Sequence, residues 1–339
     1  MHVEFTRHTQ EATFHSPLED FEAVTVPTEI RADPLTGRET RIVVDNFLLP
    51  EEEPDVEAYL TDDEGCFFCP GAVESQTPTY PDWLSVERGS VGEATSFPNL
   101  NPYAGHSNVV ALTEDPYVPL DEFPVDHFAD GLQAALQYVR EVFAHDPDAA
   151  YASVNMNFLR PAGSSVTHPH MQTLVDDRGT TRQRRLAEAA RDYYDEHDTV
   201  YWADLATEER GGDRYLAELG SVHWLAPFAP KHHRHVLAVA AQSQTGLPDP
   251  AGDVVADFAS GLVDTLDYYA SLGLNSFNVA LFLEPEAAAL PPLMEVTARS
   301  VFDEYYWSDA PFFTVFHDES VVDTPPEEYG KGARPFFQN

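Results

Sequence analysis

The feature that most constrains the fold of this chain is a pattern of segments that occurs twice. Residues 100–112 read Leu-Asn-Pro-Tyr-Ala-Gly-His-Ser-Asn-Val-Val-Ala-Leu, and residues 225–239 read Leu-Ala-Pro-Phe-Ala-Pro-Lys-His-His-Arg-His-Val-Leu-Ala-Val. Both contain Leu-x-Pro-aromatic-Ala, a short turn and an apolar run typical of a strand. Self-similarity of this kind indicates a duplicated unit, although chance resemblance is the alternative for so degenerate a match.

The segments that follow each copy are also parallel. Apolar residues recur at helical spacing over 121–145 and again over 253–272. Each predicted helix leads into an apolar strand, at 152–159 or 277–283, and then into a further strand, at 168–174 or 293–301. We therefore predict an α+β fold with a duplicated unit, two largely antiparallel sheets and helices packed on them. We place the units at residues 1–212 and 213–339.

Three segments outside this pattern are predicted to be peripheral. Residues 49–63 are acidic, contain two prolines and indicate a loop or lid. Residues 176–212 hold a charged insertion that we expect to be helical around 182–197, and residues 325–339 indicate a tail.

The net charge of -39 limits the partners of the chain. Lysine occurs only at Lys231 and Lys331, and the acidic residues are spread over the whole sequence. Such self-repulsion is screened at molar salt and favours a halophilic archaeon, although an ordinary acidic protein is the alternative. We expect no nucleic-acid partner, because a basic footprint is missing. Without a long apolar run or a secretory signal, we expect no membrane partner and a cytoplasmic location.

Two motifs carry the candidate chemistry. Cys66 and Cys69 form Cys-x-x-Cys, the spacing of half a zinc site or of a redox pair. In Gly-Ser-Ser-Val-Thr-His-Pro-His-Met-Gln, which ends at Gln172, strand alternation predicts that His168, His170 and Gln172 share one face. A glycine- and serine-rich loop near imidazole suits phosphoryl chemistry, because neutral imidazole attacks without losing a proton. The alternative is a pair of structural histidines beside a turn.

In these motifs the chain resembles the galactose-1-phosphate uridylyltransferases, the transferase branch of the histidine-triad (HIT) superfamily. The His-Pro-His-x-Gln motif carries Gln172 where hydrolases of the superfamily carry a third histidine. The resemblance spans most of the chain, and its other matching segments are residues 31–37, 66–71, 97–99, Asn157 with Gly163 and Ser165, and 223–224.

The resemblance implies HIT-like units and a double displacement through a nucleotidyl-histidine. His170 would attack the α-phosphorus of a nucleotide sugar, and Gln172 with Ser165 would hold the phosphoryl oxygens. The residues implied to contact the nucleotide are Phe97, Asn99, Asn157 and Gly163. For Phe97, a purely structural role in the core is an equal alternative.

The resemblance also implies one structural zinc ion, held by Cys66, Cys69 and His168. The position of the fourth ligand falls near Pro116, where Asp115 or His106 would have to substitute.

The chain departs from the family elsewhere. A second family metal site has no histidines in residues 294–300, so we expect that metal to be absent. Two family arginines fall on Asn46 and Leu49. We interpret a cluster of three histidines at 232, 233 and 235 as a solvated loop rather than a metal site.

The predicted activity is nucleotidyl transfer between a nucleotide sugar and a sugar 1-phosphate. Uridylyl transfer to a hexose 1-phosphate, as in galactose metabolism, is expected from the family name alone. One alternative is phosphorolysis of a nucleotide sugar or a dinucleoside polyphosphate. An alternative of another class is a nucleotide-binding relative without turnover. A homodimer is expected from the family.

Overall fold

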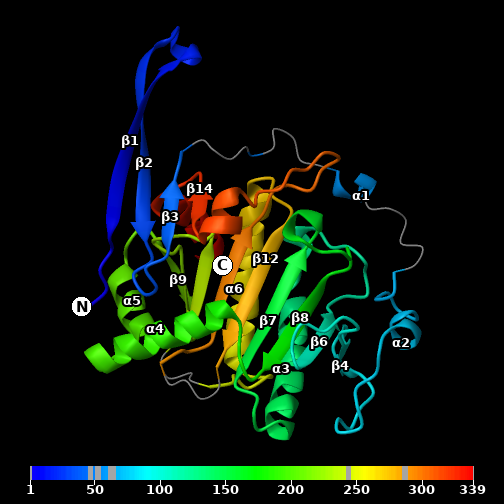
Figure 1. The fold of residues 1–339 in the computed structure, drawn as a ribbon. Coiled ribbons are helices and arrows are strands. Elements are labelled where there is room, and N and C mark those ends of the chain that lie inside the picture. Colours follow the sequence, from blue (N-terminus) through cyan, green and yellow to red (C-terminus); the bar gives the residue numbers. More distant parts are fainter. Residues whose placement is uncertain are drawn as a thin grey trace.

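A single ten-stranded antiparallel sheet organises the computed structural model, which describes residues 2–44, 49, 55–59, 66–241, 246–284 and 289–338 (Figure 1). The strand order is β4-β5-β6-β8-β7-β12-β13-β11-β10-β9. The strands are β4 (Gly89–Val91), β5 (Ala94–Pro98), β6 (His106–Ala111), β7 (Tyr151–Phe158), β8 (His170–Asp176), β9 (Tyr215–Leu219), β10 (Val222–Leu225), β11 (Val236–Ala240), β12 (Phe277–Leu283) and β13 (Leu293–Ala298).

This order confirms the predicted duplication. The first copy contributes β4 to β8 and the second contributes β9 to β13, in mirrored order about the β7–β12 pair. In each copy a long helix precedes the central strand: α3 (Val125–His145) before β7, and α6 (Asp253–Ser271) before β12. The predicted α+β class with two largely antiparallel sheets is confirmed, and both copies contribute their strands to the larger sheet.

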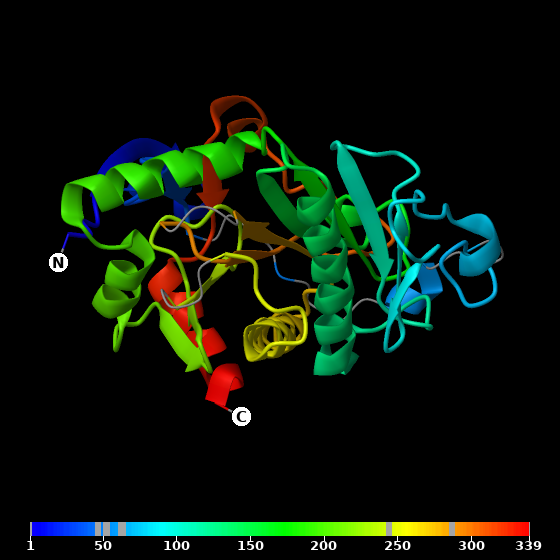
Figure 2. The same cartoon turned by 90° about the horizontal axis from the view of Figure 1, so that it is seen from below.

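The helices α3 and α6 lie side by side on one face of this sheet (Figure 2). The apolar stripe of α3 supplies Leu132, Leu136 and Val139 to the main core, each at most 1% exposed. In α6, Gly261 lies against the Trp224 indole, where an added Cβ would approach a ring atom to 2.2 Å. Close packing of both helices thus fixes the shape of the shared sheet.

The opposite face is covered over its second half by α4 (Thr181–His197) and α5 (Tyr201–Glu209). A capping box between Thr180 and Gln183 starts α4, which confirms the predicted helical insertion. A second core forms beneath these helices, and it includes Leu186, Trp202, Leu225, Leu237 and Phe282. On the first half of the sheet, the same face carries the site described below.

A second sheet of four strands, in the order β1-β2-β3-β14, lies beside the large one. The strands are β1 (Arg7–Ser16), β2 (Glu22–Ala32), β3 (Glu39–Ile42) and β14 (Ser320–Val322). The first two form a long hairpin that projects from the body (Figure 1). The short helices α1 (Val56–Tyr59) and α2 (Val73–Gln76) lie at the other end of the molecule. Most of the predicted loop at 49–63 lies outside the described residues.

The predicted tail is wrong. Residues 325–339 instead include α7 (Pro326–Ala333) and a 3-10 turn at Arg334–Gln338. Tyr329, Ala333 and Phe337 recur every fourth residue and are all buried, so this segment packs on the core. Within the described part of the chain, no helix is long and apolar enough to cross a membrane.

Candidate active site

The predicted pair of His170 and Gln172 lies on the face of β8 that points away from the helices. The alternate residues Met171 and Val175 are buried in the main core, which fixes this orientation. The strand begins at His170, so the prediction that His168 belongs to the same strand face is wrong. Pro169 has no N–H to donate, and its carbonyl accepts a bond from Leu112 N, so regular strand geometry begins after it.

His170 is held in one tautomer by the backbone carbonyl of His168, two residues earlier. Its Nδ1 lies 2.8 Å from the carbonyl oxygen of His168, so Nδ1 carries the proton and donates it. The lone pair is then on Nε2, the nitrogen available for attack. The side chain is 6% exposed, and burial lowers the pKa of His170, partly opposed by this hydrogen bond. The imidazole is therefore neutral at neutral pH, as a nucleophile requires.

A cavity of about 190 Å³ opens onto His170. It brings together five of the predicted site residues: Phe97, Asn99, Ser165, His170 and Gln172. Apolar residues complete the wall, among them Phe67, Phe68, Pro78, Leu100, Tyr103, Val109 and Val166. No lysine or arginine is among the described residues that line it. A ligand here meets an aromatic wall and neutral hydrogen-bond donors.

Phe97 is both a core residue and a wall of this cavity. It is 2% exposed and packs with Phe68, Val109 and Ala111. The Phe68 ring lies 5.3 Å between centroids from both Phe97 and His170. The aromatic packing therefore places the imidazole as well as shaping the cavity.

Gly163 and Asn157 do not line the cavity but flank it. Gly163 ends the 3-10 turn Arg160–Ala162 with φ +89°, which favours glycine, and an added Cβ would meet nothing within 4 Å. Asn157 lies near the end of β7, and its Oδ1 accepts a 2.6 Å bond from Asn278 Nδ2 on β12. Asn157 is therefore tied to β12, and Gly163 ends the turn from which the chain continues to Ser165.

Asn278 belongs to a chain of hydrogen bonds that the sequence analysis missed. Its Nδ2 also donates to the Ala162 carbonyl at 2.9 Å, and its Oδ1 accepts from Arg299 Nη1 at 2.6 Å. Arg299 is anchored in turn by the carboxylate of Asp309. A single amide within the apolar strand Phe-Asn-Val-Ala-Leu-Phe-Leu was the available signal. The second copy thereby contacts the site of the first.

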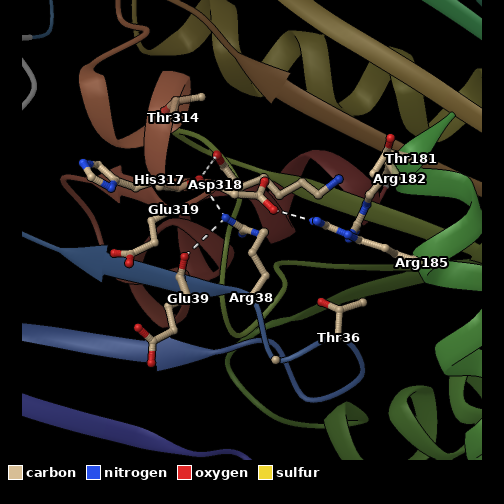
Figure 3. Close-up of a pocket in the computed structure, with 13 residues that line it drawn as sticks. Thr36, Arg38, Glu39, Thr181, Arg182, Arg185, Thr314, His317, Asp318 and Glu319 are labelled. Atoms are coloured by element: carbon tan, nitrogen blue, oxygen red, sulfur yellow. Dashed lines mark hydrogen bonds and ion pairs between the residues drawn. The ribbon is translucent and has the colours of Figure 1, made fainter.

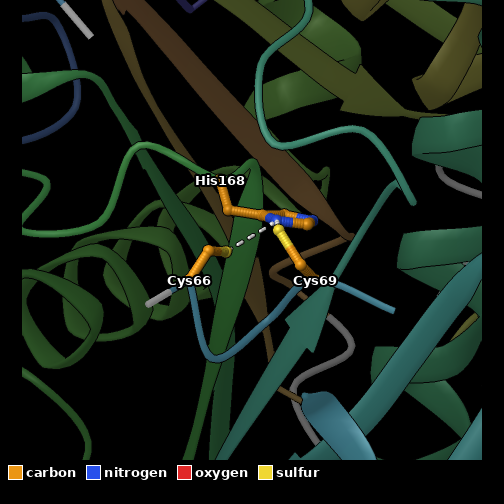
Figure 4. A group of neighbouring side chains, drawn as sticks. All are labelled: Cys66, Cys69 and His168. Carbon is orange, nitrogen blue, oxygen red and sulfur yellow. Dashed lines mark hydrogen bonds between the residues drawn. The ribbon is translucent and has the colours of Figure 1, made fainter. Parts of the chain in front are cut away.

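The ligand atoms of Cys66, Cys69 and His168 all lie within 4.8 Å of one another (Figure 4). His168 Nδ1 is 3.4 Å from Cys66 Sγ and 3.7 Å from Cys69 Sγ. Its Nε2 lies 2.7 Å from the Thr113 carbonyl oxygen, so Nε2 carries the proton and Nδ1 turns its lone pair toward the sulfurs. Two thiols and an imidazole oriented by a backbone carbonyl are a donor set that fits zinc.

The predicted fourth ligand is not found among the described residues of this group. His106 lies at the far end of β6 and pairs with Asp146, with 2.9 Å between Nε2 and Oδ2, so the suggestion that His106 reaches the cysteines is wrong. Asp115 is exposed and does not belong to the cluster. Residues 60–65, directly before Cys66, lie outside the described residues, as does Asn46.

The histidines at 233 and 235 are buried, so the prediction of a solvated loop is wrong. His233 pairs with Asp323, and His235 accepts a bond from Lys231 N. On β13, within the segment expected to lack the second metal, the Glu295 carboxylate is ion-paired with Arg182 and Lys231. Two cations around one carboxylate disfavour a metal ion at this position.

The fold and this site define a class of proteins. A solved ADP-glucose phosphorylase from Arabidopsis thaliana with bound ADP-glucose is 17% identical, with 91% of this chain and 98% of that chain covered and a TM-score of 0.68. A uridylyltransferase structure is 23% identical over 91% and 98% of the two chains, with a TM-score of 0.67. The chain thus has the fold of this ADP-glucose phosphorylase and this uridylyltransferase.

Comparison with known protein sequences places the chain in a family. No family model matches the chain. An uncharacterized protein from Archaeoglobus fulgidus is 34% identical over 312 residues, which cover 91% of this chain and 92% of that protein. The chain belongs to one family with this archaeal protein.

Proposed function

We propose that the protein is a nucleotidyltransferase that uses His170 as its nucleophile. The observation that carries the proposal is the hydrogen bond from His170 Nδ1–H to the His168 carbonyl, at 2.8 Å. It leaves the Nε2 lone pair on a buried, neutral imidazole that lines a cavity. The fold shared with a uridylyltransferase and an ADP-glucose phosphorylase supports the same assignment.

The reaction has two displacements. In the first, His170 Nε2 attacks the α-phosphorus of a nucleotide sugar, a phosphorus–nitrogen bond forms, and the bond to the leaving oxygen breaks. Sugar 1-phosphate departs with that electron pair. In the second, an acceptor phosphate oxygen attacks the same phosphorus and the electron pair returns to Nε2. Ser165 and Gln172 donate hydrogen bonds to the phosphoryl oxygens, on which charge accumulates.

The specific form that we propose is uridylyl transfer from a UDP-hexose to a hexose 1-phosphate, as in galactose metabolism. A second candidate is phosphorolysis, in which inorganic phosphate is the acceptor and a nucleoside diphosphate is released. The bound ADP-glucose in the Arabidopsis phosphorylase of the same fold favours that candidate. Both share the first displacement, so the acceptor distinguishes them.

The zinc ion that Cys66, Cys69 and His168 would hold has a structural part in this proposal. When bound, it would cross-link the Cys-x-x-Cys loop to the residue two positions before the nucleophile. Phe68 lies inside that loop and packs against His170, so the ordering of the loop also positions the imidazole.

The resemblance further supports a homodimer, which sedimentation in molar KCl would test.

The test is isolation of the covalent intermediate. The purified protein is incubated in molar KCl with UDP-, ADP- or GDP-sugars labelled in the nucleotide, and the modified peptide is mapped by mass spectrometry. We expect an acid-labile, base-stable adduct on His170, release of sugar 1-phosphate, and ping-pong kinetics once an acceptor is added. Supplying either hexose 1-phosphate or inorganic phosphate then identifies the acceptor.

Three variants separate the roles. His170→Gly should abolish the adduct, with partial turnover restored by added imidazole, and Gln172→Ala should slow transfer without loss of stability. His106→Ala is the matched control, because His106 pairs with Asp146 and does not line the cavity. An adduct on another residue, or wild-type turnover by His170→Ala, would refute the proposal. Folded protein that binds nucleotide sugars without any adduct would instead establish the inactive relative.

A further inference from the structure

A second cavity of this chain is larger than the one at His170. It measures about 680 Å³ and lies between the loop before β3, the start of α4 and the segment 314–320 (Figure 3). We call it the basic cavity, and its lining is Thr36, Gly37, Arg38, Glu39, Thr181, Arg182, Arg185, Lys231, Thr314, His317, Asp318, Glu319 and Ser320. Its volume is that of a typical small-molecule site, whereas none of its lining residues belongs to the His170 cavity.

This cavity gathers positive charge in a chain that has little. The sequence has 19 lysine and arginine residues but 58 aspartate and glutamate residues, which gives the net charge of -39. Four of the 19 basic residues line this one cavity. Figure 3 shows Arg38 extending from the β3 side toward Asp318, while Arg182 and Arg185 face it from α4. Because the overall field of the protein repels anions, a local cluster of cations is what allows an anion to bind.

Arg38 is a half-buried cation that forms no ion pair with any described carboxylate, although Asp33, Glu295 and Asp318 are near enough to act on its charge. Its guanidinium donates to neutral oxygens: Ser320 Oγ at 2.9 Å, and Thr40 Oγ1 and the Ala229 carbonyl, each at 3.1 Å. Among the described residues no carboxylate lies within 4.0 Å of it, and burial lowers the pKa of Arg38. Removing such a charge from water is costly unless an anion compensates it, so this guanidinium favours an anionic ligand.

Arg182 and Lys231 add a second uncompensated charge. Both are ion-paired with Glu295, which leaves two cations for one carboxylate. Arg182 Nε is also buried and has no hydrogen-bond partner in the described structure. A buried N–H donor without an acceptor is destabilising, and an oxygen of a ligand in the basic cavity would satisfy it.

The acidic residues of the lining do not cancel this excess. Glu319 pairs with Arg41 at 2.8 Å, outside the lining itself. Asp318 pairs with Arg185, but their side chains are 67% and 60% exposed, so this pair is weak and Arg185 is available to a ligand. Glu39 is exposed at the rim.

We propose that the basic cavity is a second ligand site, which binds a phosphate-bearing small molecule or inorganic phosphate. Arg38 and Arg185 contact the phosphate oxygens from opposite sides, and Arg182 and Lys231 supply the net charge from the floor. The threonine hydroxyls of the lining donate further hydrogen bonds. Arginine forks match the oxygens of a phosphate better than those of a monovalent ion.

The composition of the chain makes a covalent test possible. Pyridoxal 5′-phosphate carries a phosphate and an aldehyde: the neutral Nζ of a lysine attacks the aldehyde carbon, water leaves and an imine forms. Borohydride then delivers hydride to the imine carbon and yields a stable secondary amine. Among the side chains, only Lys231, in the cavity, and Lys331, outside it, can react this way, and peptide mapping separates both from a labelled α-amino group. Burial lowers the pKa of Lys231 to about 8, so its neutral amine is available under mild conditions.

Pyridoxal lacks the phosphate and exists largely as a cyclic hemiacetal, so pyridoxal 5′-phosphate labels any lysine faster. We expect this preference for the phosphate ester to be at least tenfold greater at Lys231 than at Lys331, which is exposed and pairs with Asp213. Inorganic phosphate or glucose 1-phosphate should protect Lys231, and the more effective of the two identifies free phosphate or an ester as the ligand. An equal preference at the two lysines, or no protection by either anion, would overturn the proposal.

Variants separate this site from the neighbouring chemistry. Arg185→Gln should raise the phosphate concentration needed for protection several-fold, and because Arg185 is exposed, the fold should be retained. Arg184→Gln is the matched control on the same helix, since within the described part of the chain Arg184 donates to the backbone carbonyls of Arg178 and Gly179 and does not line the cavity. His170→Ala should leave labelling and protection unchanged. Loss of protection in His170→Ala, or an equal effect of the two arginine variants, would contradict a separate site.

Discussion

Asn278 is the residue through which the second copy supports the site of the first, and its removal is a quantitative test. Asn278→Ala deletes two neutral hydrogen bonds, to Asn157 and to the Ala162 carbonyl, and one bond from Arg299. Each neutral bond contributes about 1 kcal/mol, but Asn278 is only half-buried, and Arg299 keeps its carboxylate partner. We therefore expect a loss of about 1.5 kcal/mol in the free energy of unfolding, measured by urea titration in molar KCl.

The same substitution should also lower the rate of the first chemical step. Without the amide, Asn157 and the turn before Gly163 are no longer fixed, so the rate of adduct formation at His170 should fall about tenfold, which corresponds to ~1.4 kcal/mol. Asn278→Asp keeps the acceptor for Arg299 but removes both donors, and it should show the same rate defect. The double variant with Asn157→Ala should be no slower than Asn278→Ala. Unchanged adduct formation in Asn278→Ala would refute the reasoning.

Other predictions follow from single features. Elemental analysis should find about one zinc per chain after purification without chelators, and Cys69→Ser should lose it; well-folded protein without zinc would contradict the assignment. The unfolding midpoint should fall as KCl is lowered from molar to millimolar levels, because the Debye length grows from about 3 Å to 30 Å, and a flat profile would argue against a halophilic protein. The rate at which pyridoxal 5′-phosphate labels Lys231 should rise around pH 8, where the neutral amine forms, and not near pH 10.5, the ordinary pKa of lysine. Phe337→Ala should lower the free energy of unfolding, measured by urea titration, by about 3 kcal/mol, since Phe337 is 4% exposed and its ring packs on Trp224.

The sequence predicted the parts of the fold that repeat. Helical periodicity located α3 and α6, and two apolar runs located β7 and β12, because both patterns extend over many residues. The pairing of β14 with β3 joins residues 280 positions apart through a three-residue strand. Such a strand has no periodicity of its own, so no local pattern could have predicted it. The packed C-terminal helix was missed for a related reason, since its short apolar stripe resembles that of an exposed tail.

The candidate site was predictable where alternation applied. His170 and Gln172 are two residues apart on one strand, so alternation predicts that they face the same side. Both line the same cavity, as expected. His168 was misplaced because Pro169 interrupts the strand ladder, and the carbonyl bond of His168 Nε2 turns its ring toward the cysteines. His233 and His235 were expected in solvent because histidine is polar. Their burial is set by the second core and by Asp323, which lies 90 positions from His233.

Duplication placed two equivalent sheet faces in one molecule, and their charges have diverged. On β8, His170 is a neutral imidazole in a cavity whose described lining has neither lysine nor arginine. On β13, the corresponding strand of the second copy, the buried Glu295 is surrounded by cations. Burial keeps the His170 ring neutral on the first face, whereas the second face gathers cations around a carboxylate. The two faces have thus come to differ in charge, while the bond between Asn157 and Asn278 joins the two copies.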